Sequence, residues 1–234
     1  MIRNSQTMVL NMSNECLDAP YMPGNPDVRL DYYEMSGINC YLDDESGKVI
    51  RNDLKKYGAN GIHYIDNGNY HYLSLLFLEM IEEDFALVLY DNHPDMKPPA
   101  FGGITSCGGW VLEAAEKLDH LKKIYMIGME SKLIDELENI HDKVVYVKAY
   151  RDGKWQVQRR TDDIMQEYEL ADNDIIDALK GETLPLAISL DLDVLKEDEF
   201  QCGWSQGIMT SDAMKSQVEN LIENHDVIMI DVCG

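Results

Sequence analysis

Short apolar runs and helical apolar periods alternate along this chain. The runs, bounded by turn residues, predict buried strands at residues 7–12, 61–65, 85–90, 123–127, 143–147, 184–190 and 226–231. Apolar residues at helical spacing predict helices at residues 72–83, 110–118, 131–138 and 211–224. An edge strand is predicted at residues 155–160, and a helix with a break at residues 161–179. This alternation predicts an α/β protein whose mostly parallel sheet carries helices on both faces.

The segment from Asn14 to Asp53 departs from that pattern. It is rich in Pro, Gly, Asp and Tyr and shows no clean period, so we predict an irregular stretch with at most one small hairpin. A short helix is expected at residues 53–57, ending at Gly58. Since no long or flexible linker interrupts the chain, residues 1–234 are expected to form a single domain.

Potential metal ligands follow the apolar run of residues 85–90. Asp91, His93 and Asp95 occupy every second position of the stretch Asp91-Asn-His-Pro-Asp95. In an extended backbone that spacing points all three side chains the same way. Three ionisable groups that converge after a buried strand would be costly without a metal ion. We therefore expect these three residues to be metal ligands.

Three further candidates follow other predicted strands. Asp191 and Asp193 come after residues 184–190 at the same spacing, and His71 follows the turn at Asn67-Gly-Asn69. Sites in parallel sheets form at the carboxyl ends of the strands, so the six candidates are expected to converge. Oxygen-rich sites with some imidazole suit manganese or another divalent first-row metal. Because four aspartates overcompensate one divalent ion, we expect two adjacent ions, which would generate hydroxide from a bridging water at neutral pH.

Composition argues against nucleic acid and anionic membranes as partners. The formal net charge of −23 repels nucleic acid and anionic membranes, and it favours cationic substrates and metal ions. The five cysteines are scattered and include no Cys-x-x-Cys pair, which argues against a disulfide framework and favours a reducing cytoplasm. No signal-peptide core follows Met1, and the longest apolar stretch, near residues 73–80, is too short to span a bilayer.

The paired aspartate motifs resemble those of the arginase, or ureohydrolase, family, which includes arginase, agmatinase and formimidoylglutamase. The matching stretches are Asp91-Asn-His-Pro-Asp95 and Ser189-Leu-Asp-Leu-Asp193. Gly68-Asn-Tyr-His71-Tyr72 keeps the histidine of the family's Gly-Gly-Asp-His-Ser motif and loses the rest. Gln206-Gly-Ile208 resembles the family's Gly-Gly-Leu. The resemblance covers roughly Gly61 to the C-terminus.

This resemblance implies a fold, a metal centre and a reaction. The fold would be a three-layer α/β/α sandwich, and the cofactor two Mn²⁺ ions. Two aspartates would bridge the ions, and two further ligands would complete each site: Asp91 and Asp191 as bridges, His71 and Asp95 at the first ion, His93 and Asp193 at the second. A metal-bridging hydroxide would cleave a C–N bond of a linear guanidino, amidino or formimino compound. Asp95 would carry the proton from the hydroxide to the leaving nitrogen.

Two departures from the family pattern keep other hypotheses open. The stretch from Thr105 to Trp110 lacks the family's proton-shuttle histidine, and Val232-Cys-Gly234 stands where a substrate-holding glutamate is expected to follow. The chain could therefore be a catalytically inactive, metal-binding relic. A metal-dependent phosphoesterase is the other alternative, although Asn92 stands where those enzymes carry a second histidine. The resemblance leaves the oligomeric state open, since family members often form trimers or hexamers.

Substrate contacts are expected on two loops. The glycine-rich stretch from Gly102 to Gly109 precedes a helix, so the backbone N–H groups of Gly108 and Gly109 could face a ligand, or the glycines could simply permit a tight turn. Glu130 follows a predicted strand at a place where family members often contact substrate.

Overall fold

Strand β5 (Phe85–Tyr90) divides the hydrophobic core into two layers. In the computed structural model, which describes residues 1–98, 103–137, 140–161, 164–170 and 175–234, every residue of β5 is buried. Leu87 and Leu89 pack into one hydrophobic cluster, whereas Val88 and Tyr90 pack into another. Because successive side chains of a strand point to opposite faces, β5 belongs to a sheet that is covered on both sides.

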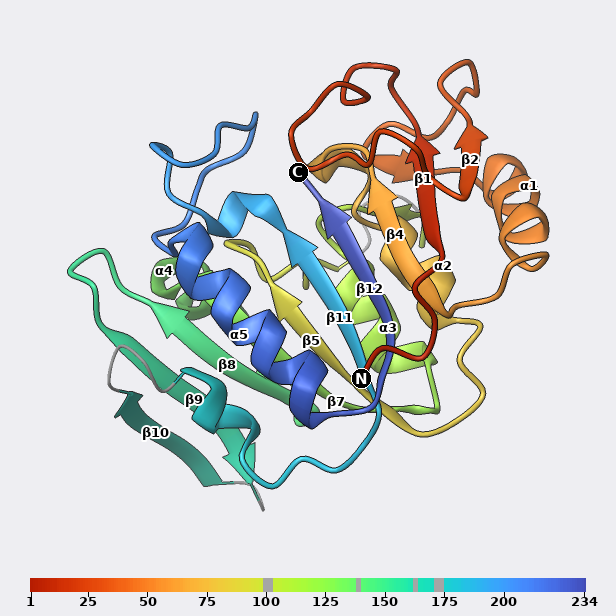
Figure 1. Ribbon diagram of the computed structural model, residues 1–234. Coiled ribbons are helices and arrows are strands. Elements are labelled where there is room, and N and C mark those ends of the chain that lie inside the picture. The colour runs from red at the N-terminus through yellow and green to blue at the C-terminus, as the bar shows by residue number, and fades with distance from the viewer. Residues whose placement is uncertain (99–102, 138–139, 162–163, 171–174) are drawn as a thin grey trace.

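A ten-stranded sheet forms the centre of the described structure, in the order β10-β9-β8-β7-β5-β11-β12-β4-β1-β2 (Figure 1). Its other strands are β1 (Thr7–Asn11), β2 (Val28–Asp31), β4 (Gly61–Ile65), β7 (Leu121–Glu130), β8 (Val144–Ala149), β9 (Trp155–Thr161), β10 (Ile164–Leu170), β11 (Leu186–Asp191) and β12 (Val227–Cys233). Strand β9 pairs antiparallel with β8 and β10, and the remaining pairings of this sheet are parallel. Strands β3 (Tyr41–Leu42) and β6 (Thr105–Ser106) form a separate antiparallel pair. The predicted mostly parallel sheet is confirmed.

Helices cover both faces of the sheet. The α-helices are α1 (Asp44–Leu54), α2 (Leu73–Leu78), α3 (Trp110–Lys117), α4 (Ser131–Asp135) and α5 (Ser211–Asn224), and the 3₁₀ helices are η1 (Gly68–Tyr70), η2 (Ile175–Leu179) and η3 (Leu192–Val194). Helix α5 crosses one face, and α2 and α3 lie behind the sheet on the other (Figure 1). Each face has its own core: Phe77 of α2 belongs to one cluster and Leu221 of α5 to the other. The three-layer α/β/α sandwich is therefore confirmed.

The irregular stretch predicted at residues 14–53 is wrong in part. Strand β2 pairs in parallel with β1 instead of forming a hairpin, and α1 occupies most of the segment's end. The short helix predicted at residues 53–57 is therefore misplaced. Helix α1 begins where the Asp43 carboxylate accepts a hydrogen bond from the backbone N–H of Ser46 at 2.8 Å. Its buried face includes Ser46 and Gly47 besides Ile50 and Leu54, so two of the four buried positions carry no apolar side chain that would mark the helix in the sequence.

The helix predicted at residues 161–179 is also wrong. Strand β10 occupies residues 164–170 and is followed by the 3₁₀ helix η2, while residues 162–163 and 171–174 lie outside the described residues. Strand β9 is consequently an interior strand rather than the predicted edge. Because nearly all of β10 is exposed, no apolar face marks it in the sequence. Helices α2 and α4 are shorter than predicted, and Glu138, near the expected end of α4, is not among the described residues.

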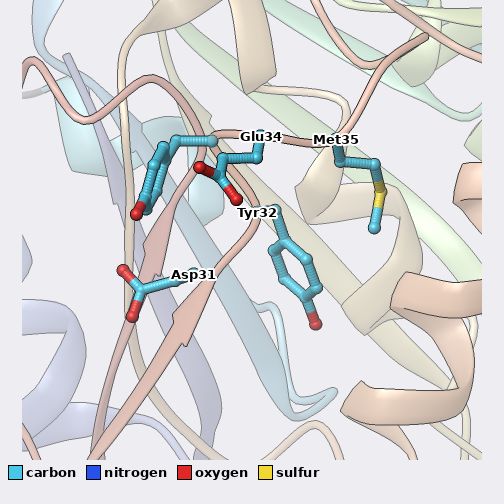
Figure 2. Close-up of a pocket in the computed structure, with 5 residues that line it drawn as sticks. Asp31, Tyr32, Glu34 and Met35 are labelled. Carbon is cyan, nitrogen blue, oxygen red and sulfur yellow. The ribbon is translucent and has the colours of Figure 1, made fainter.

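The carboxyl ends of the central parallel strands meet at one edge of the sheet, since β5, β11, β12 and β4 are consecutive neighbours. Each candidate metal ligand follows one of these strands. A small cavity of about 380 Å³ lies farther along, at the end of β2, and is lined by residues 31–35, with Asp31 and Glu34 among them (Figure 2). None of the described helices has both the length and the apolar character that a membrane crossing requires.

Candidate metal centre

Strands β5 and β11 set the spacing of the two aspartate motifs. They are parallel neighbours, and Leu190 is in register with Tyr90. The residue after Tyr90 is Asp91 and the residue after Leu190 is Asp191, so the two aspartates lie side by side at the carboxyl end of the sheet. Both carboxylates are buried. Neighbouring parallel strands therefore account for the convergence of two motifs that are 100 residues apart in sequence.

The two motifs are turns rather than the extended segments that the alternating pattern predicts. Strand β5 ends at Tyr90, and the Asp91 carboxylate accepts a hydrogen bond from the backbone N–H of His93 at 2.6 Å. The Asp191 carboxylate likewise accepts from Asp193 N–H at 2.9 Å, at the start of η3. Asp95 has a left-handed backbone, with a φ of 47°. Asp95 and His93 consequently fall into two different groups around Asp91, and the turns produce this arrangement because each first aspartate accepts a hydrogen bond from the backbone two residues on.

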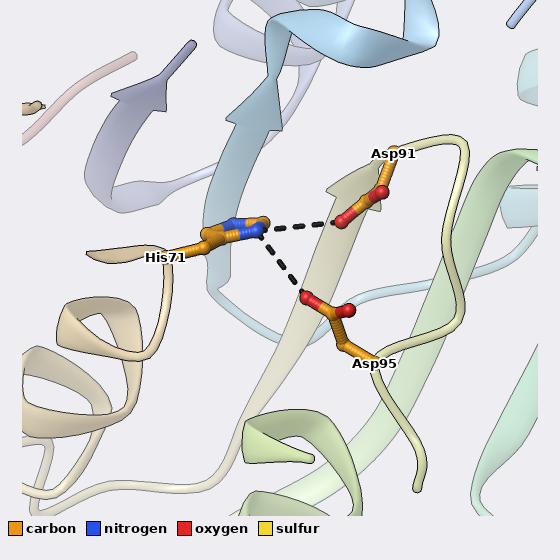
Figure 3. Close-up of side chains that lie close together, drawn as sticks. All are labelled: His71, Asp91 and Asp95. Atoms are coloured by element: carbon orange, nitrogen blue, oxygen red, sulfur yellow. Dashed lines mark ion pairs between the residues drawn. The ribbon is translucent and has the colours of Figure 1, made fainter. Parts of the chain in front are cut away.

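His71 reaches the aspartates from strand β4. The side chain of Asn67 caps η1, and His71 follows directly after that helix. Its Nδ1 atom lies 3.3 Å from Asp91 Oδ2, 3.5 Å from Asp95 Oδ2 and 3.2 Å from Asp191 Oδ2. In Figure 3 the imidazole points between the carboxylates of Asp91 and Asp95. One nitrogen therefore faces three carboxylates at the end of the parallel sheet.

A second histidine completes a second group. His93 Nδ1 lies 2.7 Å from Asp193 Oδ2 and 3.6 Å from Asp91 Oδ1. Two sets of potential ligands result, and in each the ligand atoms lie within 4.8 Å of one another: His71, Asp91 and Asp95 in the first, and Asp91, His93 and Asp193 in the second. Asp91 is common to both sets, as expected of a bridging ligand. Asp191, the other predicted bridge, contacts His71 but belongs to neither set.

Two buried atoms between these groups lack hydrogen-bond partners. They are His71 Nδ1 and Asp91 Oδ2, and both side chains are only 1% exposed. Burial disfavours a charge on His71, but the nearby carboxylates of Asp191, Asp91 and Asp95 outweigh it and hold the pKa of His71 well above its ordinary value. Buried polar groups without partners are costly, and a cation would satisfy both atoms. The donor set thus fits a divalent metal ion.

Several groups of the cluster have raised pKa values and therefore favour their protonated forms. Burial and the charge of Asp91 raise the pKa of Asp95 to about 6, and burial also raises the pKa of Asp191. Burial alone would lower the pKa of His93, but hydrogen bonds with Asp193 and Asp91 raise it to about 11. Metal binding requires neutral imidazoles and ionised carboxylates, so divalent ions would displace these protons.

Sequence analysis missed the residues that orient the histidines. Nε2 of His71 lies 2.9 Å from Ser189 Oγ, and that hydroxyl donates its proton to Asp231 Oδ1 at 2.5 Å. A hydroxyl has one proton, so Ser189 must accept from His71 Nε2–H, which leaves the Nδ1 lone pair for a metal ion. The signal in the sequence was a single polar residue inside each of two apolar strands, β11 and β12.

Two further neighbours hold the other ligands. Ser205 Oγ lies 2.8 Å from His93 Nε2, on the side of the imidazole away from Asp193. The indole N–H of Trp110 donates to Asp95 Oδ2 at 2.8 Å, and Trp110 is fully buried. The helical pattern at residues 110–118 indicates only that Trp110 packs into the core. Only its tertiary position identifies it as a donor to a predicted ligand.

A cavity of about 1080 Å³ opens onto the cluster, and Gly108 lines it. Gly109 and Glu130, the other predicted substrate contacts, are not among its described lining residues. A Cβ atom on Gly109 would lie 2.7 Å from the carbonyl oxygen of Lys97, so the close approach of two backbones accounts for that glycine. The Glu130 carboxylate pairs with Nε of Arg151 at 3.1 Å.

Comparison with known proteins identifies the fold. No family model matches the chain. An uncharacterized protein from Thermotoga maritima is 26% identical over 201 residues, covering 86% of this chain and 68% of that protein. Similar solved structures include formimidoylglutamase from Bacillus subtilis, with a TM-score of 0.60 and 12% identity over 98% of this chain and 78% of that one.

Two more solved structures agree. Trypanosoma cruzi formiminoglutamase, determined with Mn²⁺, has a TM-score of 0.60 and 11% identity over 98% of this chain and 85% of that one. Arginase from Bacillus cereus has a TM-score of 0.58 and 13% identity over 98% of this chain and 90% of that one. The chain therefore has the α/β fold of the arginase, or ureohydrolase, family, as its aspartate motifs predicted.

Proposed function

We propose that this protein is a binuclear-metal hydrolase that cleaves a C–N bond of a linear guanidino, amidino or formimino compound. The observation that carries the proposal is the pair of ligand sets that share Asp91, with two unpartnered buried atoms between them. The proposed ions are two Mn²⁺, by analogy with the formiminoglutamase determined with Mn²⁺. The proposed ligands are Asp91 and Asp191 as bridges, His71 and Asp95 at the first ion, and His93 and Asp193 at the second.

Two ions held by these residues would lower the pKa of water, so that hydroxide would be available near neutral pH. The protein holds the ligand side chains in position and excludes bulk water from them. His71 and Asp91 are each 1% exposed, so the inner part of the centre is closed to bulk solvent. In such surroundings each charge interaction is stronger than in water, which strengthens the attraction of the carboxylates for a cationic substrate.

Asp95 is the proposed proton carrier. Its Oδ2 atom lies 3.5 Å from His71 Nδ1, inside the cluster, so the carboxylate is placed to accept a proton from the attacking water and to deliver it to the leaving nitrogen. Trp110 holds one carboxylate oxygen of Asp95 through its indole N–H, so the side chain keeps one orientation while the proton moves. This arrangement gives Asp95 the task for which the Thr105–Trp110 stretch offers no histidine.

The metal pair is tested by measuring metal content. We expect wild-type protein, loaded with manganese and dialysed, to retain two ions per chain by mass spectrometry. Asp91→Ala and Asp191→Ala should each lose the pair, and Asp198→Ala, which removes an exposed carboxylate outside the cavity, should retain it. Two fully occupied ions in either of the first two variants would overturn the bridging assignment.

The reaction is tested by turnover. The manganese-loaded protein is assayed for release of urea, ammonia or formamide from a panel of guanidino, amidino and formimino compounds. Hydrolysis of at least one compound is expected. Two bound ions without turnover of any member would favour the inactive relic instead.

A phosphodiester assay separates the remaining alternative. Phosphoesterases need cationic groups that face the phosphate, and the lysine and arginine among the described cavity-lining residues are Lys97 and Arg160. The guanidinium of Arg160 lies 3.5 Å from the Asp142 carboxylate, so its charge is already partly compensated. We therefore expect no phosphodiester hydrolysis above the metal-only control.

A further inference from the structure

Trp204 occupies an unusual place for a large aromatic side chain. It lines the same cavity as Asp91, Asp95, Asp191 and Asp193, yet it is 42% exposed. Leaving an indole ring in water forfeits a large part of the free energy that its burial would supply. An exposed ring beside a cluster of carboxylates is therefore expected to be covered by a ligand when the cavity is filled.

The loop that carries Trp204 is fixed to the metal centre. The next residue, Ser205, contacts His93 through its hydroxyl at 2.8 Å and accepts a hydrogen bond from Asn92 Nδ2 at 2.9 Å through its carbonyl. Two residues farther on, the N–H of Gly207 donates to the carbonyl of Asp193 at 2.7 Å. The backbone beside Trp204 is thus fixed before any ligand arrives, which reduces the entropic cost of ordering this loop on binding.

The position of the indole is set by a glycine. A Cβ atom on Gly68 would lie 2.9 Å from Cδ1 and from Nε1 of Trp204, and 3.5 Å from Asp191 Oδ2. The absence of a side chain at Gly68 therefore allows the ring to approach the metal-binding carboxylates. The ring of Trp204 also meets the His93 imidazole edge to face, with centroids 5.9 Å apart and an interplanar angle of 70°. One side of the indole packs on the centre while part of the ring stays open to the cavity.

An indole face beside a carboxylate favours a particular kind of ligand, a planar cation. An indole face attracts cations, and the attraction grows when water is excluded. Planar delocalised cations combine that attraction with stacking, and their N–H groups can still point in the ring plane toward acceptors. Asp191 supplies such an acceptor beside Trp204. The net charge of −23 on the chain further favours a cation over an anion.

We propose that Trp204 is a specificity-determining residue whose indole stacks on the planar cationic head group, an amidinium or guanidinium, of the substrate. This inference rests on the proposed function, since it places that head group at the metal centre. It narrows the substrate class to compounds that are cationic at the reacting carbon. Neutral amides and ureas of the same shape gain only the dispersion part of the contact.

Binding to manganese-loaded protein, measured by calorimetry, tests the proposal without requiring turnover. The two probes are n-butylguanidinium and its neutral isostere n-butylurea. Trp204→Ala is expected to weaken guanidinium binding by about five- to thirty-fold while changing urea binding by less than about twofold. Trp204→Phe, which keeps a weaker aromatic face, should fall between Trp204→Ala and wild type for the cation.

The matched control is Tyr57→Ala, which removes another exposed aromatic ring, 39% exposed, from the segment that precedes β4 at the opposite edge of the sheet. It should bind both probes as the wild type does. Unchanged guanidinium affinity in Trp204→Ala, or an equal loss for both probes, would overturn the role of Trp204, and so would a wild type that binds neither probe. Retention of two metal ions in each variant verifies that the centre is intact.

The two proposals fail separately. If wild-type protein hydrolyses a member of the substrate panel but Trp204→Ala binds the cation normally, the role of Trp204 is wrong and the hydrolase assignment stands. If Trp204 selects the cation but no compound is turned over, the binding role stands and the hydrolase assignment is wrong.

Discussion

Replacing His63 with leucine should remove a large part of the acid sensitivity of the fold. His63 lies in β4, is 1% exposed, and stacks on Phe77 with ring centroids 3.7 Å apart. Its Nδ1 atom has no hydrogen-bond partner, and burial lowers the pKa of the imidazole from 6.5 to about 3. The folded state thus holds His63 neutral, whereas the unfolded chain protonates it in mildly acidic solution.

The sign and size of the effect follow from that difference. A lowered pKa in the folded state means that the stabilisation is fully present above the unfolded value of 6.5 and is lost as the pH falls toward 3. At about pH 5, protonation of His63 in the unfolded chain favours unfolding by about 2 kcal/mol relative to about pH 8. Leucine does not titrate and has a similar volume, so this contribution should disappear in His63→Leu.

Urea denaturation of the metal-free protein at the two pH values measures the effect. The quantity of interest is the fall in unfolding free energy between about pH 8 and about pH 5, which should be about 2 kcal/mol smaller in His63→Leu than in wild type. Any packing defect of the variant is present at both pH values and cancels. His120→Gln, which removes an exposed histidine, should keep the contribution of His63. Equal falls in wild type and His63→Leu would refute the reasoning.

Three other substitutions test the surroundings of the metal centre. Asp231→Asn removes the charge behind the Ser189 hydroxyl, so manganese affinity by calorimetry should fall by about 10- to 100-fold, and an unchanged affinity would contradict this role. Trp110→Phe removes the donor to Asp95 and should cost about 1–3 kcal/mol in urea denaturation, together with lower kcat on any substrate found. Gly109→Ala places a Cβ atom 2.7 Å from a backbone carbonyl oxygen and should destabilise the fold by about 1–3 kcal/mol; full stability by thermal denaturation would show that the backbone yields.

Much of the fold could be predicted because a buried strand is a run of apolar residues that can be recognised in the sequence. Strands β4 and β5 and helix α5 have the predicted bounds, since each combines an apolar run or period with a clear start and stop. Helix α1 and strand β10 were missed for the opposite reason. The buried positions of α1 do recur at helical spacing, but Ser46 and Gly47 occupy two of them and give no apolar signal, and β10 is exposed along almost its whole length.

In the candidate site, too, some features could be predicted from local spacing and others depended on strand order. The spacing of Asp91, His93 and Asp95 predicts metal ligands, because three ionisable groups that converge after a buried strand would be costly without a cation. The pairing of Asp91 with His71 and Asp193 depended on strand order and could only be expected from the parallel topology. The rule that parallel strands end at a common edge predicts that these residues lie close together, and in the structure His71 Nδ1 lies 3.3 Å from Asp91 Oδ2.

The sequence by itself determined the α/β class, the Asp and His residues that are candidate metal ligands, and the edge of the sheet on which they gather. Those features are local, since a period of apolar residues or a spacing of carboxylates is read along one stretch of chain. The tertiary structure alone decided that Asp91 is shared between two ligand sets, that Ser189 and Asp231 orient His71, and that the Trp204 ring opens into the cavity. Contacts between residues this far apart depend on strand order, loop path and packing, which no local pattern encodes.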